Sequence, residues 1–291
     1  MKLDGQEESE NVEDRRGISA GAGVMGGGAG LIILILAVIF KVDPAKLTQL
    51  IGGGGSPQNN SSQATGPRQS ADPEEEKQAH FTKVILGDTE VIWGQLFQEM
   101  GKKYPKPTLV LFTGQVNSAC GAADAAVGPF YCGGDQKVYI DLSFYKDMQR
   151  SLNAPGDFAR AYVVAHEVGH HVQSLLGYSD QVHEAKRSSD QVEAHHMSVR
   201  LELQADYFAG VWAYHAQKKF NFLEKGDVES ALHAAFEIGD DRLQKKARGT
   251  VVPDTFTHGT SKQRMTWFNK GFTTGDVKGA AALFNLPYEK L

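Results

Sequence analysis

The sequence lacks a basic block, an internal repeat and a second pair of cysteines. Its net charge of −5 combines both signs along the chain, so the composition gives no support for a nucleic-acid partner. The two cysteines, Cys120 and Cys132, are too widely spaced for a C-x2–4-C zinc knuckle. The 291 residues are enough for one substantial domain with appendages.

Long apolar stretches are equally scarce, and a single one stands out. Residues 17–40 carry no charged side chain and end in an aliphatic run at 31–40. This length is sufficient to span about 30 Å of hydrocarbon. A cleaved signal peptide would need a small-residue cleavage site after the run, and a core helix would need a polar face; neither is present. The segment is predicted to be one transmembrane helix in a lipid bilayer.

The segments on either side of this predicted span are polar. Residues 1–16 are acid-rich and are predicted to be a disordered tail. Residues 41–79 contain a Gly/Ser/Asn-rich stretch with too little apolar content to fold, which predicts a flexible linker. Arg15 and Arg16 at the boundary favour a cytoplasmic N-terminus. The folded domain, residues 80–291, would then be periplasmic or extracellular.

The two cysteines flank a loop rich in glycine and alanine. Two free buried thiols are one possibility for Cys120 and Cys132. A disulfide across this short loop would stabilise the fold by roughly 3 kcal/mol, and such bonds persist outside the cytoplasm. The cysteine pair and the predicted topology support each other, so we predict a Cys120–Cys132 disulfide.

The chain is organised around an H-E-x-x-H motif at residues 166–170. On a helix, His166 and His170 lie on one face, where two imidazoles can share one zinc ion. Glu167 lies one step round the helix and could take a proton from zinc-bound water. The apolar run before the motif predicts a buried helix over 157–176 with Asp157 as its N-cap. A histidine-bearing helix without metal is the alternative.

A catalytic zinc ion needs a third protein ligand and one open position. An H-E-x-x-H-x-x-G-x-x-H site is excluded, because Gln173 and Leu176 stand where the glycine and the third histidine would be. Glu202 and Asp206, in an E-x-x-A-D stretch, share one face of a second helix. Glu202 is predicted to bind zinc and Asp206 to hold the far nitrogen of a ligand histidine. A solvated helix face is the alternative, which the apolar neighbours disfavour.

The two motifs at 166–170 and 202–206 together resemble the gluzincin metallopeptidases, of which thermolysin is a member. The chain resembles more closely the bacterial putative neutral zinc metallopeptidase family. This resemblance implies an α+β, predominantly helical zincin-like domain with one catalytic zinc ion on His166, His170 and Glu202, acting on a peptide or protein substrate. Beyond the histidine motif, the resemblance rests on residues 128–132, 138–144, 198–206, 238–241 and 256–264.

Two residues near the C-terminus enter through the same resemblance. His258, in a loop, and Arg264, on the helix predicted to follow, resemble a His…Arg arrangement of membrane-associated gluzincins that faces the zinc site. Gly259 stands where a proline is usual. The resemblance implies that both residues stabilise the transition state. A capping loop with Arg264 in a surface ion pair is the alternative.

Periodicity and turn residues predict the remaining elements. Asp88 is the expected N-cap of the first of these helices, and the acidic pair at 240–241 reads as a solvated patch or as a cap for nearby amides. The stretch 128–141 is the candidate for the strand that pairs with substrate in thermolysin-like peptidases, and an ordinary sheet strand fits equally well. Helices are expected at 88–102, 188–218, 227–247 and 261–271, and strands at 108–112 and 137–141.

The sequence therefore predicts a membrane-anchored zinc peptidase with Glu167 as general base and water as the fourth zinc ligand. The alternative is a membrane-tethered binding or assembly module with a structural zinc ion. That site would need a fourth protein ligand, and either His195 or His196 could supply it, because adjacent helical residues point about 100° apart. The intact Glu167 favours the peptidase.

Overall fold

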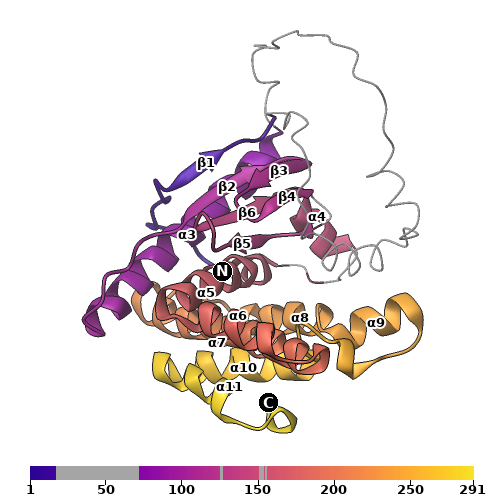
Figure 1. Ribbon diagram of the computed structural model, residues 1–291. Coiled ribbons are helices and arrows are strands. Elements are labelled where there is room, and N and C mark those ends of the chain that lie inside the picture. Colours follow the sequence, from indigo (N-terminus) through magenta and orange to yellow (C-terminus); the bar gives the residue numbers. More distant parts are fainter. Residues whose placement is uncertain (18–71, 125–126, 151–153, 155) are drawn as a thin grey trace.

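A four-stranded sheet lies on one side of a layer of helices (Figure 1). Most of the secondary structure is helical, so the predicted α+β, predominantly helical class is confirmed. The computed structural model describes residues 1–17, 72–124, 127–150, 154 and 156–291.

The sheet has the strand order β1-β2-β6-β5. Strands β1 (Val12–Asp14), β2 (Thr108–Phe112) and β6 (Lys137–Asp141) run parallel, and β5 (Phe130–Cys132) is antiparallel to β6. The predicted strands at 108–112 and 137–141 are confirmed. In both strands every residue after the first is buried, as expected for parallel strands that are covered on both faces.

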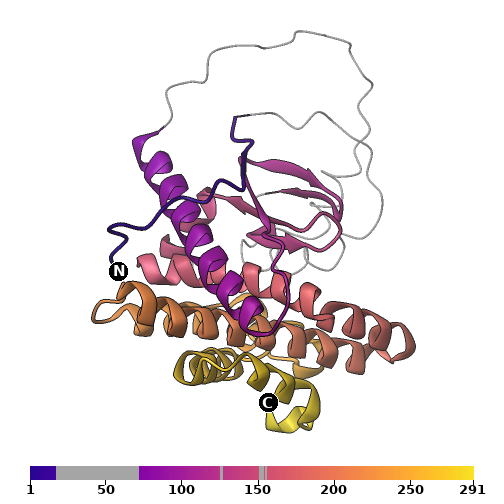
Figure 2. The ribbon, with the colours of Figure 1, turned by 90° about the vertical axis from the view of Figure 1, so that its left-hand side faces the viewer.

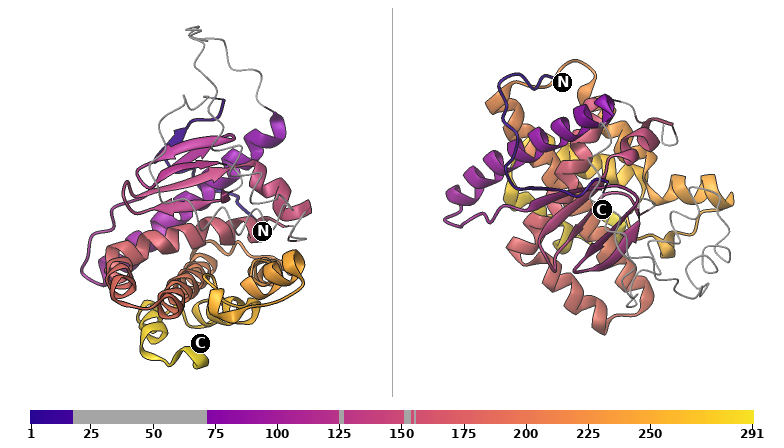
Figure 3. Two further views of the ribbon diagram at one scale, coloured as in Figure 1. Left: turned by 45° about the vertical axis from the view of Figure 1, so that its right-hand side comes forward. Right: turned by 90° about the horizontal axis from the view of Figure 1, so that it is seen from above.

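The helical layer is built on three elements. Helix α5 (Asp157–Leu176) lies beside the sheet and contacts β5, and α7 (Gln191–Phe220) packs against α5. Helix α10 (Ser261–Thr274) packs on α7, on the side away from the sheet (Figure 3). The remaining elements are α3 (Pro73–Glu99), β3 (Gln115–Ser118), β4 (Gly121–Asp124), α4 (Ser143–Arg150), α6 (Tyr178–Ser188), α8 (Asp227–Glu237), α9 (Asp240–Arg248), α11 (Ala282–Asn285) and the 3-10 turns η2 (Pro253–Thr255), η3 (Val277–Ala281) and η4 (Tyr288–Lys290).

Large aromatic side chains join α3, α5 and α7. The ring of Trp93 on α3 meets that of Phe208 on α7 edge to face, with centroids 5.5 Å apart. Phe158 at the start of α5 stacks on Trp212 of α7 at 6.3 Å. All four side chains are fully buried, and their burial fixes the two helices that carry the sequence motifs against each other.

The helix at 157–176 is confirmed with the same bounds, although its N-cap is Gly156 and Asp157 is its first residue. The helix expected at 227–247 is wrong as one element, because the chain turns at Gly239 and forms α8 and α9. This turn places Asp240 and Asp241 at the start of α9, where their carboxylates meet the loop before α10.

Helix α3 begins 15 residues earlier than predicted, at Pro73 instead of Asp88. Asp72 is the N-cap, and its carboxylate accepts the Glu74 amide at 3.1 Å. Asp88 instead lies in the middle of α3 and is buried. The first half of α3 is polar in sequence but buries Phe81 and its apolar neighbours in the core, so the folded chain that follows the predicted linker begins near residue 72 instead of residue 80.

The disordered tail predicted for residues 1–16 is wrong. These residues, hereafter the N-terminal strap, cross α3 and then form β1, which pairs with β2 (Figure 2). The Ser9 amide donates to the Lys83 carbonyl at 3.1 Å, and Ser9 Oγ and Asn11 Nδ2 donate to Glu90 at 2.7 and 2.9 Å. The strap is therefore part of the folded domain.

Charge pairs explain why an acid-rich segment is ordered. Glu8 pairs with His80 and Lys83 of α3, and Arg16 pairs with Glu75 and Glu76. Glu13 pairs with Lys137 of β6. The partners lie roughly 60 to 120 residues further along the chain, so the composition of the strap alone does not reveal them.

The strap bears on the predicted membrane topology. The predicted span at 17–40, apart from Gly17, lies outside the described residues, as does most of the predicted linker at 41–79. Among the residues that are described, no helix combines the length and apolarity needed to cross a membrane. Strand β1 precedes the predicted span in the sequence and pairs with β2, which follows it, so the strap and the domain form one folded unit. The orientation with a cytoplasmic N-terminus and an external domain stays a prediction.

Candidate metal centre

The two sequence motifs meet where α5 and α7 cross. A Cβ atom on Gly169 would lie 2.9 Å from the backbone oxygen of Ala205 and 3.1 Å from its Cα atom, so only glycine fits at this point. Glycine in a helix costs about 1 kcal/mol relative to alanine. The close approach explains why glycine is there, and it brings Glu202 within reach of the histidines.

His166, His170 and Glu202 come together as predicted. One potential ligand atom from each lies within 4.8 Å of the others. The Nε2 atoms of His166 and His170 are 3.3 and 3.6 Å from the two Glu202 carboxylate oxygens. A tetrahedral zinc ion with bonds of about 2.0–2.1 Å separates its ligand atoms by about 3.3 Å. The three residues therefore fit a zinc ion.

The far nitrogen of each histidine is held by another side chain. Nδ1 of His166 lies 2.8 Å from Asp206, which confirms the contact predicted for that residue. Nδ1 of His170 lies 2.8 Å from Oε1, the side-chain carbonyl oxygen, of Gln173. The sequence analysis used Gln173 only to exclude another type of site. The sequence could have indicated this contact, because Gln173 follows His170 by three residues on one helix and side chains with this spacing are neighbours.

Asp206 is the centre of a buried charged network. Arg264 donates to both oxygens of Asp206 at 2.8 and 2.9 Å, and Tyr162 also donates to the carboxylate. Asp206 is fully buried and the Arg264 side chain is 3% exposed. The predicted role of Arg264 in the transition state is corrected here: its guanidinium binds Asp206 behind His166 and neutralises that carboxylate. The surface ion pair considered as the alternative is equally wrong.

The electrostatics of the centre favour a bound cation. Burial by itself would lower the pKa of His166, but Asp206 and Glu202 raise it to about 10. Burial would raise the pKa of Glu202, yet the neighbouring His170 and His258 hold it well below its ordinary value. Ionised carboxylates therefore stabilise positive charge between the ring nitrogens, where a metal ion would supply it.

Glu167 lies next to the ligand set with its carboxylate unused. Within the described part of the chain, it has no hydrogen-bond or ion-pair partner. Burial raises the pKa of Glu167, so the carboxylate binds a proton more readily than in water. A free, buried carboxylate beside an open metal position is the arrangement that a general base requires.

Asp240 holds His258, which lies close enough to Glu202 for the two charges to shift each other's pKa. One oxygen of Asp240 accepts the backbone amides of Thr257, His258 and Gly259 at 2.8, 2.6 and 3.1 Å. The other oxygen lies 3.3 Å from Nδ1 of His258. Burial would lower the pKa of His258, and Glu202 and Asp240 raise it. The raised pKa favours the charged ring, in which both nitrogens carry hydrogen, so Nε2 can act as a donor while Nδ1 faces Asp240. The cap function of the 240–241 pair is confirmed.

Neither candidate for a fourth protein ligand joins the cluster. His195 bonds to the backbone oxygen of Asp254, and His196 stacks on the ring of Tyr288 with centroids 3.5 Å apart. Among the described residues, the only group able to hold a metal ion is the set of three. A zinc ion held by these three residues would leave its fourth position to a ligand from outside the described chain, as a catalytic site requires and a closed structural site does not.

Strand β5 forms the edge of the sheet above α5 (Figure 1). Of the stretch 128–141, β5 is thus suited to pair with an extended peptide, whereas β6 lies inside the sheet and cannot. Tyr131 of β5 bonds to His171, and the other ring nitrogen of His171 bonds to the backbone oxygen of Pro105. These contacts fasten the edge strand to the helix that carries the metal ligands.

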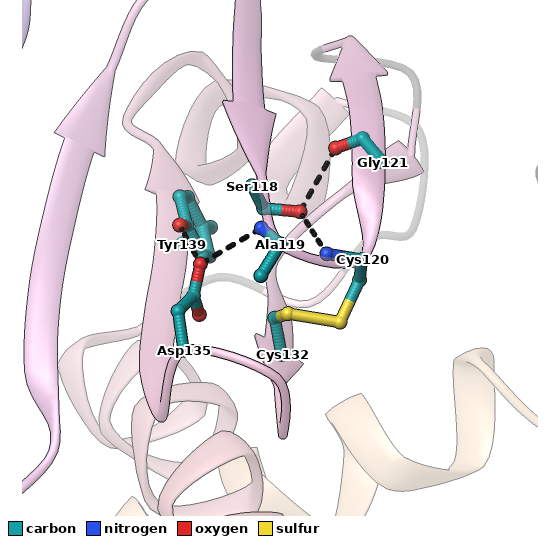
Figure 4. The surroundings of a disulfide bond; sticks show 7 residues. All are labelled: Ser118, Ala119, Cys120, Gly121, Cys132, Asp135 and Tyr139. Atoms are coloured by element: carbon teal, nitrogen blue, oxygen red, sulfur yellow. Dashed lines mark hydrogen bonds between the residues drawn. A yellow bond between two sulfur atoms is a disulfide. The ribbon is translucent and has the colours of Figure 1, made fainter. Parts of the chain in front are cut away.

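The predicted disulfide between Cys120 and Cys132 is present (Figure 4). It joins the turn between β3 and β4 to the edge strand β5. The carboxylate of Asp135 accepts the Ala119 amide at 3.0 Å and the Tyr139 hydroxyl at 2.7 Å. The disulfide and these hydrogen bonds hold the hairpin beside the strand suited to bind substrate.

Comparisons with known proteins agree with this site. A family model described as "Putative neutral zinc metallopeptidase" matches residues 1–282, which include the strap. YpfJ of Escherichia coli K12 is 49% identical over 283 residues, which cover 95% of this chain and 96% of YpfJ. Rv2575 of Mycobacterium tuberculosis H37Rv is 42% identical over 183 residues, or 60% of this chain and 61% of the relative. The names of these relatives state no activity, and no solved structure matches the chain. The chain therefore belongs to the putative neutral zinc metallopeptidase family.

Proposed function

We propose that the chain is a zinc peptidase that hydrolyses peptide bonds with Glu167 as the general base. The observation that carries this proposal is the set of Nε2–carboxylate distances of 3.3 and 3.6 Å, beside the buried carboxylate of Glu167, which has no hydrogen-bond or ion-pair partner among the described residues. When bound, a zinc ion would acidify a water molecule and polarise the scissile carbonyl.

Side chains of the protein would carry out proton transfer, stabilise the developing oxyanion and position the metal ligands. Glu167 takes a proton from the attacking water and passes it to the leaving amine. His258, fixed by Asp240, donates a hydrogen bond to the carbonyl oxygen as negative charge develops there. Asp206 and Gln173 hold the ligand rings in place from behind. Asp206, Gln173 and Asp240 act through hydrogen bonds that they already make, and Glu167 acts through a carboxylate that has no partner among the described residues.

The substrate class follows from the edge strand. An extended peptide can pair with the free side of β5 and thereby lie along α5, which carries Glu167 and both histidines. Main-chain pairing of this kind reads little of the side-chain sequence. We therefore expect unfolded or extended segments of proteins to be cleaved in preference to folded ones.

The test compares the wild type with Glu167→Gln, which has nearly the same shape and cannot accept the proton. Both proteins should bind one zinc ion, measured by elemental analysis. Only the wild type should cleave an unfolded protein substrate, and turnover should fall by at least about 10²-fold in the variant. Equal turnover would overturn the role of Glu167. A wild type that binds zinc and cleaves no unfolded protein would overturn the peptidase itself.

A separate variant tests His258. His258→Ala should reduce kcat by about 10²–10³-fold while zinc stays bound, because only the donor to the developing oxyanion is lost. His233→Ala is a matched control, since this histidine is more exposed and the ring contact and ion pair that it makes among the described residues, with Phe236 and Glu237, lie within its own helix α8. A His258→Ala protein with full turnover would leave the loop a purely structural function.

We further propose that the domain and the strap both lie outside the cytoplasm. The Cys120–Cys132 disulfide supports this location, since such bonds persist in oxidising compartments. Short epitope tags at residues 1 and 291 would test whether both ends of the chain lie outside the cytoplasm. The cells would be treated so that an added protease reaches the outer face of the cytoplasmic membrane. External protease should remove both tags. If it removes one tag and spares the other, the strap does not share the compartment of the domain.

A further inference from the structure

Gln173 lies between the two helices that carry the metal ligands. It belongs to α5, about one turn after His170, and is fully buried. Its Oε1 atom is 2.8 Å from Nδ1 of His170. Its Nε2 atom is 2.5 Å from the backbone oxygen of Leu201, the residue that precedes Glu202 on α7. One amide side chain therefore contacts one ligand directly and the backbone next to another.

The donors and acceptors in these contacts determine the orientation of the Gln173 amide and which nitrogen of the neutral His170 ring carries the hydrogen. A backbone carbonyl can only accept, so the NH₂ group of Gln173 must point to Leu201. Its carbonyl oxygen then faces His170, and because that oxygen can only accept, Nδ1 of His170 must carry the hydrogen. In the neutral ring, Nε2 is left without a proton, and Nε2 is the atom that lies 3.6 Å from Glu202.

We propose that Gln173 is a positioning residue of the metal centre, one that fixes the metal-binding form of His170 and sets its distance from Glu202. The inference rests on the proposed metal centre, and it adds a residue to which neither the sequence motifs nor the family description assigns a role. His166 has a charged partner in Asp206, whereas Gln173 supplies a neutral partner for His170.

A neutral partner has a definite consequence for the site. Asp206 already places one ionised carboxylate behind the ligand set, and Arg264 neutralises it. A second carboxylate behind His170 would have no such counter-ion among the contacts of Gln173, which are an imidazole and a backbone carbonyl. An amide orients the ring without adding a buried charge.

The experiment measures metal affinity, using Co²⁺ and Zn²⁺ in competition with a chelator. Gln173→Met keeps the approximate volume of the side chain and removes both hydrogen bonds. It should bind metal about 10–100-fold more weakly than the wild type, with a changed visible spectrum of the Co²⁺ form. Gln204→Met is the matched control, because Gln204 is a fully buried glutamine of α7 whose amide bonds only to the Ala280 carbonyl.

Thermal unfolding with and without metal separates positioning from general stability. A structural role alone would lower the melting temperature of both forms equally and leave the metal-induced increase unchanged. The positioning role predicts a smaller increase in Gln173→Met and an unchanged increase in Gln204→Met. Gln173→Glu retains an acceptor for His170 and should bind metal more tightly than Gln173→Met.

The outcomes distinguish this inference from the proposed function. Wild-type metal affinity and an unchanged Co²⁺ spectrum in Gln173→Met would overturn the inference and leave the peptidase standing. Equal weakening in Gln204→Met would also overturn it. A wild type that binds neither ion would overturn the metal centre itself, whatever the variants do.

Discussion

The metal centre and the N-terminal strap are both held together by buried polar contacts between distant residues, but they differ in what their sequences reveal. In the metal centre, His166, His170 and Glu202 belong to two helical motifs whose spacing can be recognised. In the strap, Ser9 and Asn11 meet Glu90 without any periodic pattern. A short motif on a regular helix reveals a site, whereas an irregular segment shows its function only through its partners.

The two regions also differ in what their contacts achieve. The metal centre gathers ionised carboxylates around the ligand nitrogens, which stabilises positive charge there. The strap matches acidic and basic groups across α3 and adds a strand to the sheet. Variants of the first region should therefore change metal binding, and variants of the second should change stability alone. The four predictions below test this division.

The largest effect is expected for Glu202→Ala. Two histidines alone make a poor zinc site, so the zinc content measured after dialysis should fall from about one per chain to near zero. Far-ultraviolet circular dichroism should stay unchanged. Glu193→Ala on the same helix is the control, since the Glu193 side chain is 45% exposed and its ion pair among the described residues is with His196. Full zinc content in Glu202→Ala would remove this residue from the ligand set.

Arg264→Ala is expected to affect both metal binding and stability. It leaves Asp206 buried without its counter-ion, which should lower the free energy of unfolding by about 3–5 kcal/mol in a denaturant titration.

The double variant of Arg264 and Asp206 sharpens this result. If the arginine acts by neutralising Asp206, then Arg264→Ala in an Asp206→Ala background should cost much less than in the wild type. Strictly additive losses would indicate that the two side chains act independently.

Gly87→Ala tests the strap. Helix propensity alone predicts that alanine stabilises this position of α3 by about 1 kcal/mol. A Cβ atom there would lie 2.5 Å from the backbone oxygen of Glu7, so we expect the strap to be displaced and the free energy of unfolding to fall by about 1–3 kcal/mol.

Gly94→Ala provides the matched control in the same helix. No atom lies within 4 Å of a Cβ atom built at Gly94, so alanine should raise stability by about 1 kcal/mol. Zinc content should stay at the wild-type level in both variants. The same sign of change at both glycines would contradict the close approach of the strap.

The last prediction concerns the pH dependence of stability at Asp88, an effect that is confined to one side of the titration. This residue borders a groove of about 670 Å³ between the strap and α3, and one of its carboxylate oxygens has no hydrogen-bond partner. Burial raises the pKa of Asp88 from 3.8 to about 7. Between about pH 4 and pH 7 the folded protein holds this proton and the unfolded chain does not. The stability that the protonated Asp88 contributes is therefore lost as the pH rises through about 7.

Asp88→Asn removes this titration. The variant should match the wild type near pH 4 and exceed it by roughly 2–4 kcal/mol at pH 8, measured by denaturant unfolding at each pH. Glu99→Gln at the exposed end of the same helix should show no such trend. A gain of the same size at both pH values would refute burial as the cause.

The sequence by itself determined the elements that depend on local chemistry. The apolar runs at 108–112 and 137–141 form strands with the predicted bounds, and the motif helix spans 157–176 as expected. Within one helix, a spacing of four residues fixes which side chains share a face. For this reason the histidine pair, and Asp206 behind it, were predictable before any contact between α5 and α7 was known.

Only the tertiary structure decided what each remaining residue meets. The partners of Arg264 and Glu90 lie 58 and 81 residues away, and neither distance is encoded in a local pattern. The packing of α10 on α7 directs Arg264 to Asp206, and the path of the strap across α3 turns an acid-rich segment into a strand. Periodicity identifies the face that a side chain occupies, whereas the packing of whole elements selects its partner, because burial makes an unpaired charge too costly to leave.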